Sequence, residues 1–190
     1  MTKQDARNIY MEKRLQLSTG ERNRFDDLLL IQFQKLVLPE ILLVHTYLAM
    51  ESKKEFATHA ILHFLEFQHP GVQFLIPRVN TKTKEIENIL HTDELKFQAN
   101  KWGITEPVDG TLIDAEELDL VLVPLLAFDT KGNRVGYGKG FYDKLLSKCR
   151  KDVLKVGFSY FEAVDKITDS GDFDIPLSYC VTPHRIYEFG

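Results

Sequence analysis

Apolar residues recur at helical spacing over residues 3–37, which predicts helix at the start of the chain. Ser18 and Glu21 form an S-x-x-E capping box, so we expect a second helix to begin there. Pro39 ends the pattern, because a proline cannot continue a helix interior. The pattern therefore predicts two consecutive helices.

Short apolar runs alternate with helical patterns along the rest of the chain. The expected strands cover residues 41–50, 73–79, 85–90, 118–128, 153–158 and 180–182, the expected helices 58–66 and 141–150, and an expected loop 95–110. Nearly continuous apolar strands indicate burial on both faces of a sheet. We therefore predict an α/β fold with a mostly parallel sheet flanked by helices, in a Rossmann-like three-layer arrangement. No repeat or linker interrupts the pattern, so residues 1–190 are expected to form one domain.

Composition narrows the functional classes. The longest apolar run has nine residues, from Leu120 to Phe128, whereas a membrane helix needs about 20, so no membrane contact is expected. The net charge of −4 argues against nucleic acid as a partner. Two cysteines do not make a disulfide framework, and the polar start of the chain lacks the apolar core of a secretory signal. We therefore expect a cytoplasmic protein.

A glycine-rich segment, residues 129–143, follows the strongest strand prediction and precedes a predicted helix. Open α/β sheets bind ligands at this position, beyond the carboxyl ends of their strands. Gly136, Gly138 and Gly140 alternate there, so the backbone can approach a ligand closely. The N–H groups that open the following helix attract anions. This segment is therefore our candidate phosphate site.

Charged residues in the same segment support that interpretation. Residues 129–151 hold seven basic and two acidic side chains, in a chain that is acidic overall. Arg134 and Lys139 could neutralise phosphate, and Asp143 could bind Mg²⁺. A Walker A loop is excluded because Gly140 follows Lys139 where that motif has Ser or Thr, and the spacing also differs from a dinucleotide fingerprint. The plainer alternative is a surface loop whose charges only cap a helix.

The same segment resembles the signature of the 5-formyltetrahydrofolate cyclo-ligase family. The resemblance lies in Val-Pro-Leu-Leu-Ala-Phe-Asp at 123–129 and Gly-Asn-Arg-Val-Gly-Tyr-Gly-Lys-Gly-Phe-Tyr-Asp at 132–143. Further similar elements are the pair Lys3 and Arg7, followed by Arg14, and the segments 55–58, 74–79, 102–107, 173–176 and 181–183. The resemblance therefore extends over almost the whole chain.

Membership would imply ATP- and Mg²⁺-dependent conversion of 5-formyltetrahydrofolate to 5,10-methenyltetrahydrofolate, with release of ADP and phosphate. In that reaction, phosphorylation of the formyl oxygen creates a leaving group, and nitrogen-10 of the same folate attacks the activated carbon. The protein would mainly orient the reactants and neutralise charge.

The resemblance also implies a set of site residues. The ATP ligands would be Lys3, Arg7, Arg134, Val135, Gly136, Tyr137, Gly138, Lys139, Gly140, Phe141 and Tyr142. Among them, Arg134, Lys139 and Tyr142 would be catalytic. The folate site would contain Leu48, Met50, Glu55, Trp102 and Tyr142. Asp143 and Asp174 would bind Mg²⁺.

Three departures from the family pattern bear on these assignments. The segment from Tyr47 to Glu55 is about two residues longer than usual, which affects Leu48 and Met50. Phe173 and Ser178 stand where histidine and aspartate are common, which affects the second metal ligand.

Two alternatives stay open at the level of sequence. One is a non-enzymatic nucleotide or phosphometabolite sensor that binds ATP without turnover. The other is a ligase or kinase that uses the same phosphate loop with a different acceptor. A monomer is expected rather than an oligomer.

Overall fold

Two capped helices open the chain. The computed structural model describes residues 1–100 and 105–190. Helix α1 spans Lys3–Gln16 and helix α2 spans Thr19–Phe33. The capping box at Ser18 is present as predicted, and Thr2 with Asp5 forms a second one at the start of α1. Each box satisfies backbone N–H groups that a helix start leaves without partners, and thereby fixes where the two helices begin.

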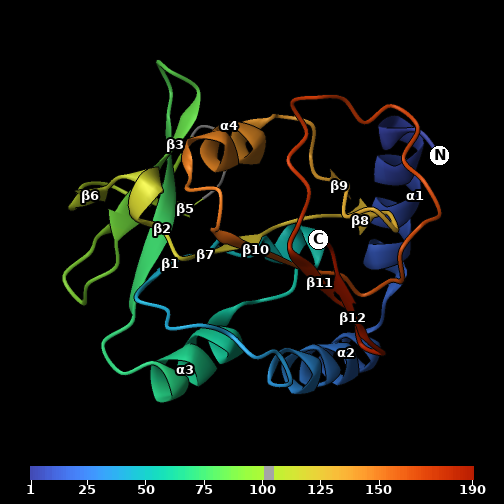
Figure 1. The fold of residues 1–190 in the computed structure, drawn as a ribbon, viewed down its shortest axis with the longest axis horizontal. Helices are drawn as coiled ribbons and strands as arrows, with labels where there is room; N and C mark the ends of the chain where they lie inside the picture. The colour runs from blue at the N-terminus through green and yellow to red at the C-terminus, as the bar shows by residue number, and fades with distance from the viewer. Residues whose placement is uncertain (101–104) are drawn as a thin grey trace.

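A large, mostly parallel sheet forms the centre of the molecule (Figure 1). Within the described ranges its strand order is β12-β11-β10-β7-β1-β2-β3-β6. The strands from β11 to β2 run parallel, and β12, β3 and β6 add antiparallel at the edges. Their bounds are β1 Leu43–His45, β2 Gln73–Asn80, β3 Glu85–Leu90, β6 Leu112–Ile113, β7 Leu120–Val123, β10 Leu154–Phe158, β11 Tyr179–Val181 and β12 Ile186–Glu188.

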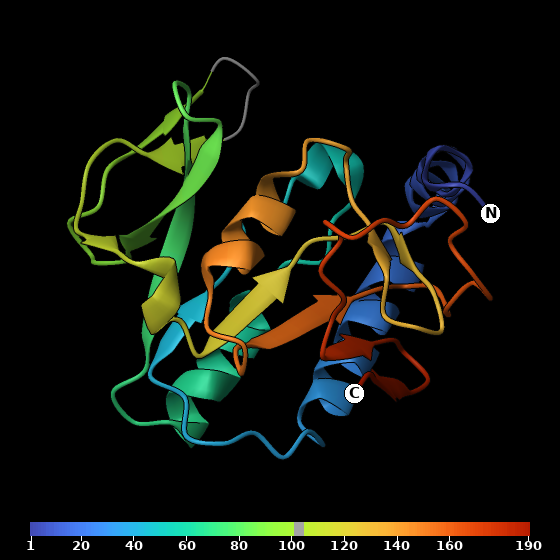
Figure 2. The same ribbon diagram turned by 45° about the horizontal axis from the view of Figure 1, so that its top comes forward.

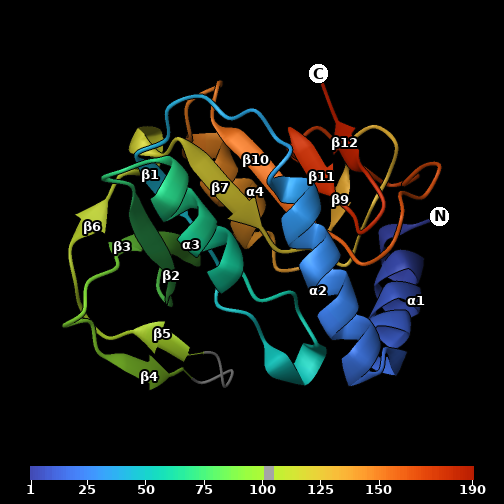
Figure 3. The same cartoon turned by 90° about the horizontal axis from the view of Figure 1, so that it is seen from below.

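Helices cover both faces of this sheet. Helices α2 and α3 (His59–Gln68) lie in front of the strands in Figure 3, and α4 (Phe141–Lys148) lies behind them. Alternate residues of β7 pack on opposite faces of the sheet, because successive side chains of a strand point to opposite sides. Leu120 and Leu122 belong to the core cluster that contains residues of α2 and α3, whereas Val121 and Val123 pack in the cluster with Leu145 of α4. The expected α/β fold with a mostly parallel sheet and flanking helices is confirmed.

Several element predictions were wrong in extent. The strand expected over 118–128 ends at Val123, because Pro124 has no N–H for a sheet ladder, and β8 (Ala127–Phe128) instead pairs with β9 (Arg134–Val135). The strand expected over 41–50 ends at His45 and is followed by the 3-10 turn η1 (Glu51–Lys53). The expected loop 95–110 contains a pair of short strands, β4 (Phe97–Ala99) and β5 (Thr105–Pro107). Directly before β7 the chain forms the 3-10 turn η2 (Ala115–Glu117).

A buried aspartate shapes the β8–β9 hairpin that precedes the glycine-rich loop. The Asp129 carboxylate is fully buried and accepts hydrogen bonds from the backbone N–H groups of Lys131, Asn133 and Ile167 at 2.9–3.0 Å. The Asn133 side-chain amide donates a fourth bond, at 2.9 Å. A buried charge is stable only with such partners. Asp129 thus fixes the turn between β8 and β9, after which the chain continues through the glycines to α4. Figure 2 shows the course of the chain from this hairpin to α4.

None of the helices in the described ranges is long and apolar enough to cross a membrane.

Candidate functional site

One face of α1 lies against the glycine-rich loop. The Arg7 guanidinium donates to the carbonyl of Gly136, with an Nε–O distance of 3.0 Å. One turn earlier, Lys3 pairs with Asp174 through Nζ–Oδ distances of 2.5 and 2.7 Å. Two turns later, Arg14 donates to the Leu125 carbonyl at 3.2 Å. Figure 1 shows α1 beside β8 and β9. Of the two predicted ATP ligands on α1, Arg7 contacts the loop itself, whereas Lys3 contacts the segment at Asp174.

At two positions of the glycine-rich loop, the backbone has a conformation that only glycine adopts readily. Gly138 and Gly140 have φ of +82° and +69°, in the left-handed region. A Cβ on Gly138 would also lie 3.2 Å from the Arg7 guanidinium carbon. Gly140 is the N-cap residue of α4 and cannot supply a side-chain cap, so the first N–H groups of this helix can donate to an anion. With exposed Lys139 between the two glycines, the loop has the donors that a phosphate group requires.

The predicted catalytic arginine pairs with the predicted metal ligand. Arg134 is 9% exposed and its Nη2 lies 2.7 Å from Asp143 Oδ1. Arg134 also donates to the carbonyl of Ile175, and the backbone N–H of Ile175 donates to Asp143 at 3.3 Å. The second predicted metal ligand, Asp174, is adjacent in sequence to Ile175. Asp143 is therefore part of this network, whereas Asp174 is bonded separately to Lys3 and the Gly171 N–H.

The chemistry of these donors fits Mg²⁺ that arrives with a phosphate ligand. Burial alone would raise the pKa of Asp174, but hydrogen bonds from Lys3 and the Gly171 N–H outweigh it and lower that pKa, so the carboxylate is ionised at neutral pH. Across residues 1–100 and 105–190, no group of three or more His, Cys, Asp or Glu side chains could hold a metal. Mg²⁺ is commonly bound by one or two carboxylates together with phosphate oxygens and waters. Asp143, with Asp174 nearby, matches that pattern.

Glu55 is buried and contacts the glycine-rich loop at Tyr137. Its Oε2 accepts from the Met50 N–H at 2.7 Å, and its Oε1 accepts from the Tyr137 hydroxyl. Tyr137 accepts in turn from Arg14, and burial followed by the Glu55 charge raises the pKa of its hydroxyl. One tyrosine of the predicted ATP loop is thus bonded to the carboxylate predicted to bind folate. Leu48 and Met50 lie half-buried between β1 and η1, and Trp102 lies outside the described residues.

An open cavity of about 660 Å³ adjoins this arrangement on the α1 side. It is lined by Arg7 and Tyr137, with Leu126 and the α1 residues Gln4, Asn8, Met11, Glu12, Leu15 and Gln16. Its volume falls within the range of small-molecule sites.

Tyr142, in the first turn of α4, contacts a buried histidine that sequence reasoning missed. Its hydroxyl lies 3.3 Å from His45 Nε2, and the two rings pack edge to face with centroids 5.7 Å apart. His45 Nδ1 lies 2.8 Å from the Asn88 side-chain oxygen. Burial raises the pKa of Tyr142; the Glu55 charge raises it further, and the Arg134 charge lowers it. A polar residue within the apolar run 41–50 was the signal that could have identified His45.

We expect the buried His45 to make the protein sensitive to mild acid. Burial lowers the pKa of His45 to about 4, from an unfolded value of about 6.5. Both states are neutral above pH 6.5, but between pH 6.5 and 4 the unfolded chain binds the extra proton, so stability falls as the pH falls. From pH 7 to 5 the wild type should lose about 2 kcal/mol more unfolding free energy than His45→Gln, measured by urea titration. Equal losses in the two proteins would contradict this assignment.

Known proteins are similar to this chain along most of its length. The model of the 5-formyltetrahydrofolate cyclo-ligase family matches residues 2–179. A 5-formyltetrahydrofolate cyclo-ligase of Haemophilus influenzae is 32% identical over 65% of this chain and 67% of its own length. Another, of Mycoplasma genitalium, is 25% identical over 94% of this chain and 97% of its own.

Solved structures agree as well. The 5,10-methenyltetrahydrofolate synthetase of Aquifex aeolicus matches with a TM-score of 0.79 and 29% identity, over 99% of this chain and 93% of the other. The synthetase of Mycoplasma pneumoniae shares the fold, with a TM-score of 0.75 at 23% identity, over 95% of this chain and 98% of the other. With a family model matched along nearly the whole sequence and a similar fold, the chain belongs to the 5-formyltetrahydrofolate cyclo-ligase family of enzymes.

Proposed function

We propose that this protein converts 5-formyltetrahydrofolate to 5,10-methenyltetrahydrofolate, with ATP and Mg²⁺, and releases ADP and phosphate. The observation that carries the proposal is the Tyr137–Glu55 hydrogen bond. It joins a loop built for phosphate to a buried carboxylate that suits the donor-rich edge of a pterin. An enzyme that phosphorylates a folate needs these two subsites side by side.

In the proposed reaction the protein binds and orients the two reactants. Arg7 holds the ATP loop through its bond to Gly136, and Lys3, one turn earlier on α1, lies at the segment that contains Asp174, from which it can reach the triphosphate. The formyl oxygen then attacks the γ-phosphorus and ADP leaves. Lys139 and Arg134 stabilise the negative charge on the transferred phosphoryl group, since preorganised charges act strongly in a site with little water.

Ring closure follows on the same surface. The lone pair of nitrogen-10 attacks the activated formyl carbon, nitrogen-10 loses its proton, and phosphate departs with the oxygen. Tyr142 and Glu55 hold the pterin in the orientation that brings nitrogen-10 to the carbon, an entropic contribution to the rate. Leu48, Met50 and Trp102 are proposed to complete the folate site.

Asp143 would hold Mg²⁺, with Asp174 as the second ligand. The metal ion would supply charge neutralisation on the nucleotide phosphates when bound. In that state, Arg134 and Lys3 would exchange their carboxylate partners for phosphate oxygens.

An absorbance assay tests the proposal directly. The protein is mixed with 5-formyltetrahydrofolate, and the near-ultraviolet band of the methenyl product is followed with and without ATP and Mg²⁺. A signal that requires both, and disappears with EDTA, is the expected result. No signal from folded protein that binds ATP would refute the proposal and favour a nucleotide sensor, or an enzyme with another acceptor.

Other features belong to the same proposal. Helices on both faces of the sheet support a Rossmann-like three-layer arrangement, and we propose that residues 1–190 act as one catalytic domain. A cytoplasmic location and a monomeric state remain predictions.

A further inference from the structure

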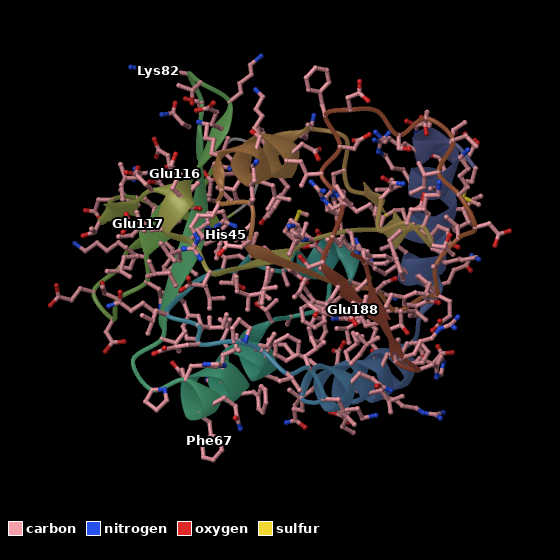
Figure 4. The ribbon with its side chains drawn as sticks, in the orientation of Figure 1. His45, Phe67, Lys82, Glu116, Glu117 and Glu188 are labelled. Atoms are coloured by element: carbon pink, nitrogen blue, oxygen red, sulfur yellow. The ribbon has the colours of Figure 1, made fainter. Side chains whose placement is uncertain are left out.

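His45 is a polar residue in the middle of the sheet core. It ends β1, a central strand, and its side chain is fully buried; Figure 4 labels it. Burial of a polar ring without hydrogen bonds is costly, and both ring nitrogens of His45 have a partner, Asn88 on one side and Tyr142 on the other.

The neighbours of His45 determine the direction of these bonds. The Asn88 amide nitrogen donates to the carbonyl of Ile113 at 3.2 Å, and a carbonyl can only accept. The Asn88 amide oxygen therefore faces His45 and accepts from an Nδ1–H group. Since the imidazole is neutral, Nε2 has no proton and accepts from the Tyr142 hydroxyl. The bonds run in one direction, from Tyr142 through His45 and Asn88 to Ile113.

This direction determines what Tyr142 can offer to a ligand. Its only hydroxyl proton is directed to His45, so its oxygen presents lone pairs and acts as an acceptor. Tyr142 directly precedes Asp143, which pairs with Arg134, so it lies beside the predicted phosphate site. The proposed function places it in the folate site as well. The partner that suits such an oxygen is an N–H group. In 5-formyltetrahydrofolate, nitrogen-10 carries a hydrogen that becomes more acidic as the new carbon–nitrogen bond forms.

We propose that His45 is a positioning residue that holds the Tyr142 hydroxyl as a hydrogen-bond acceptor toward an N–H group of the reduced folate. The proposal rests on the proposed function and adds to it a specificity device outside the signature segment. Asn88 serves by fixing the tautomer of His45, as outer partners fix ligating histidines in metal sites.

A double-mutant cycle tests whether His45 acts through that hydroxyl. We expect His45→Leu to lower kcat/KM for 5-formyltetrahydrofolate about 10- to 100-fold, with the KM for ATP changed less than about twofold. His45→Gln can donate to Asn88 and accept from Tyr142, and should recover most of the activity. In a Tyr142→Phe background, which lacks the hydroxyl, His45→Leu should cause little further loss. Equal losses from His45→Leu in both backgrounds would overturn the proposal.

A second measurement uses the wild type and needs no turnover. Nitrogen-15 NMR of the His45 ring should show a protonated Nδ1 and an unprotonated Nε2, and Tyr142→Phe should shift the Nε2 resonance alone. The opposite tautomer, or no shift, would overturn the role of His45 even where His45→Leu fails to fold. Failure of the proposed function is distinguishable, because it would appear as a wild type that does not cyclise the substrate.

Discussion

Lys139→Ala is expected to lower turnover by about 10²- to 10³-fold and to leave the melting temperature unchanged. Lys139 is exposed between two glycines of left-handed backbone, so its removal disturbs little packing. Loss of one preorganised charge on a transferred phosphoryl group typically costs this much in rate. Initial rates at saturating ATP and folate measure the effect. Lys148→Ala removes a lysine of the same charge from the exposed end of α4, where it pairs with Glu85, and is the matched control.

Arg134→Ala should lower turnover to a similar extent but also destabilise the fold. Arg134 is buried, and its removal leaves Asp143 and the Ile175 carbonyl without their donor. We expect a loss of about 1–3 kcal/mol of unfolding free energy in addition to the kinetic effect. Activity near wild type in both the Lys139 and Arg134 variants would contradict the charge-stabilising role of this loop.

Glu55→Gln is expected to lower kcat/KM for the folate substrate about a hundredfold. The substitution keeps the size of the side chain but removes the charge that a pterin edge would meet, and a buried charged hydrogen bond contributes about 1.5–3 kcal/mol. In the wild type, the Met50 N–H and the Tyr137 hydroxyl each donate to one carboxylate oxygen of Glu55. In Glu55→Gln, one of these two donors would face the NH₂ group of the amide, which cannot accept its hydrogen bond. The measurement is the initial rate against folate concentration at fixed ATP.

ATP binding separates two roles for Glu55. Calorimetric titration with ATP in the absence of folate should give nearly the wild-type affinity for Glu55→Gln. A loss of ATP affinity as large as the loss in kcat/KM for folate would mean that Glu55 supports the ATP loop through Tyr137 and does not act in the folate site. Glu51→Gln is the matched control, because Glu51 lies in the same segment but is exposed and pairs with Arg22.

The place of the glycine-rich loop, between a strand and helix α4, could be predicted because its signals are local. A strand, alternating glycines and a following helix are contiguous in sequence, and left-handed backbone at Gly138 and Gly140 depends on the residues themselves. The beginning of α2 at Ser18 could also be predicted, since its capping box acts within one turn. The beginning of α4 at Phe141 could be predicted from the glycines that precede it. The lengths of the strands were harder to predict, because a strand stops pairing where its neighbour in the sheet ends, and that neighbour is distant in sequence.

The sequence by itself determined the alternation of strands and helices, the boundary between the first two helices and the glycine-rich backbone that leads into α4. Tertiary structure alone decided the partners of the charged side chains. Arg134 with Asp143, Lys3 with Asp174, and Tyr137 with Glu55 are pairs whose strengths depend on burial and distance. Tertiary structure also revealed His45, whose role depends on Asn88, 43 residues away, and on Tyr142, 97 residues away. Local propensity acts through neighbours along the chain, whereas desolvation and hydrogen-bond direction act only between groups that folding has brought together.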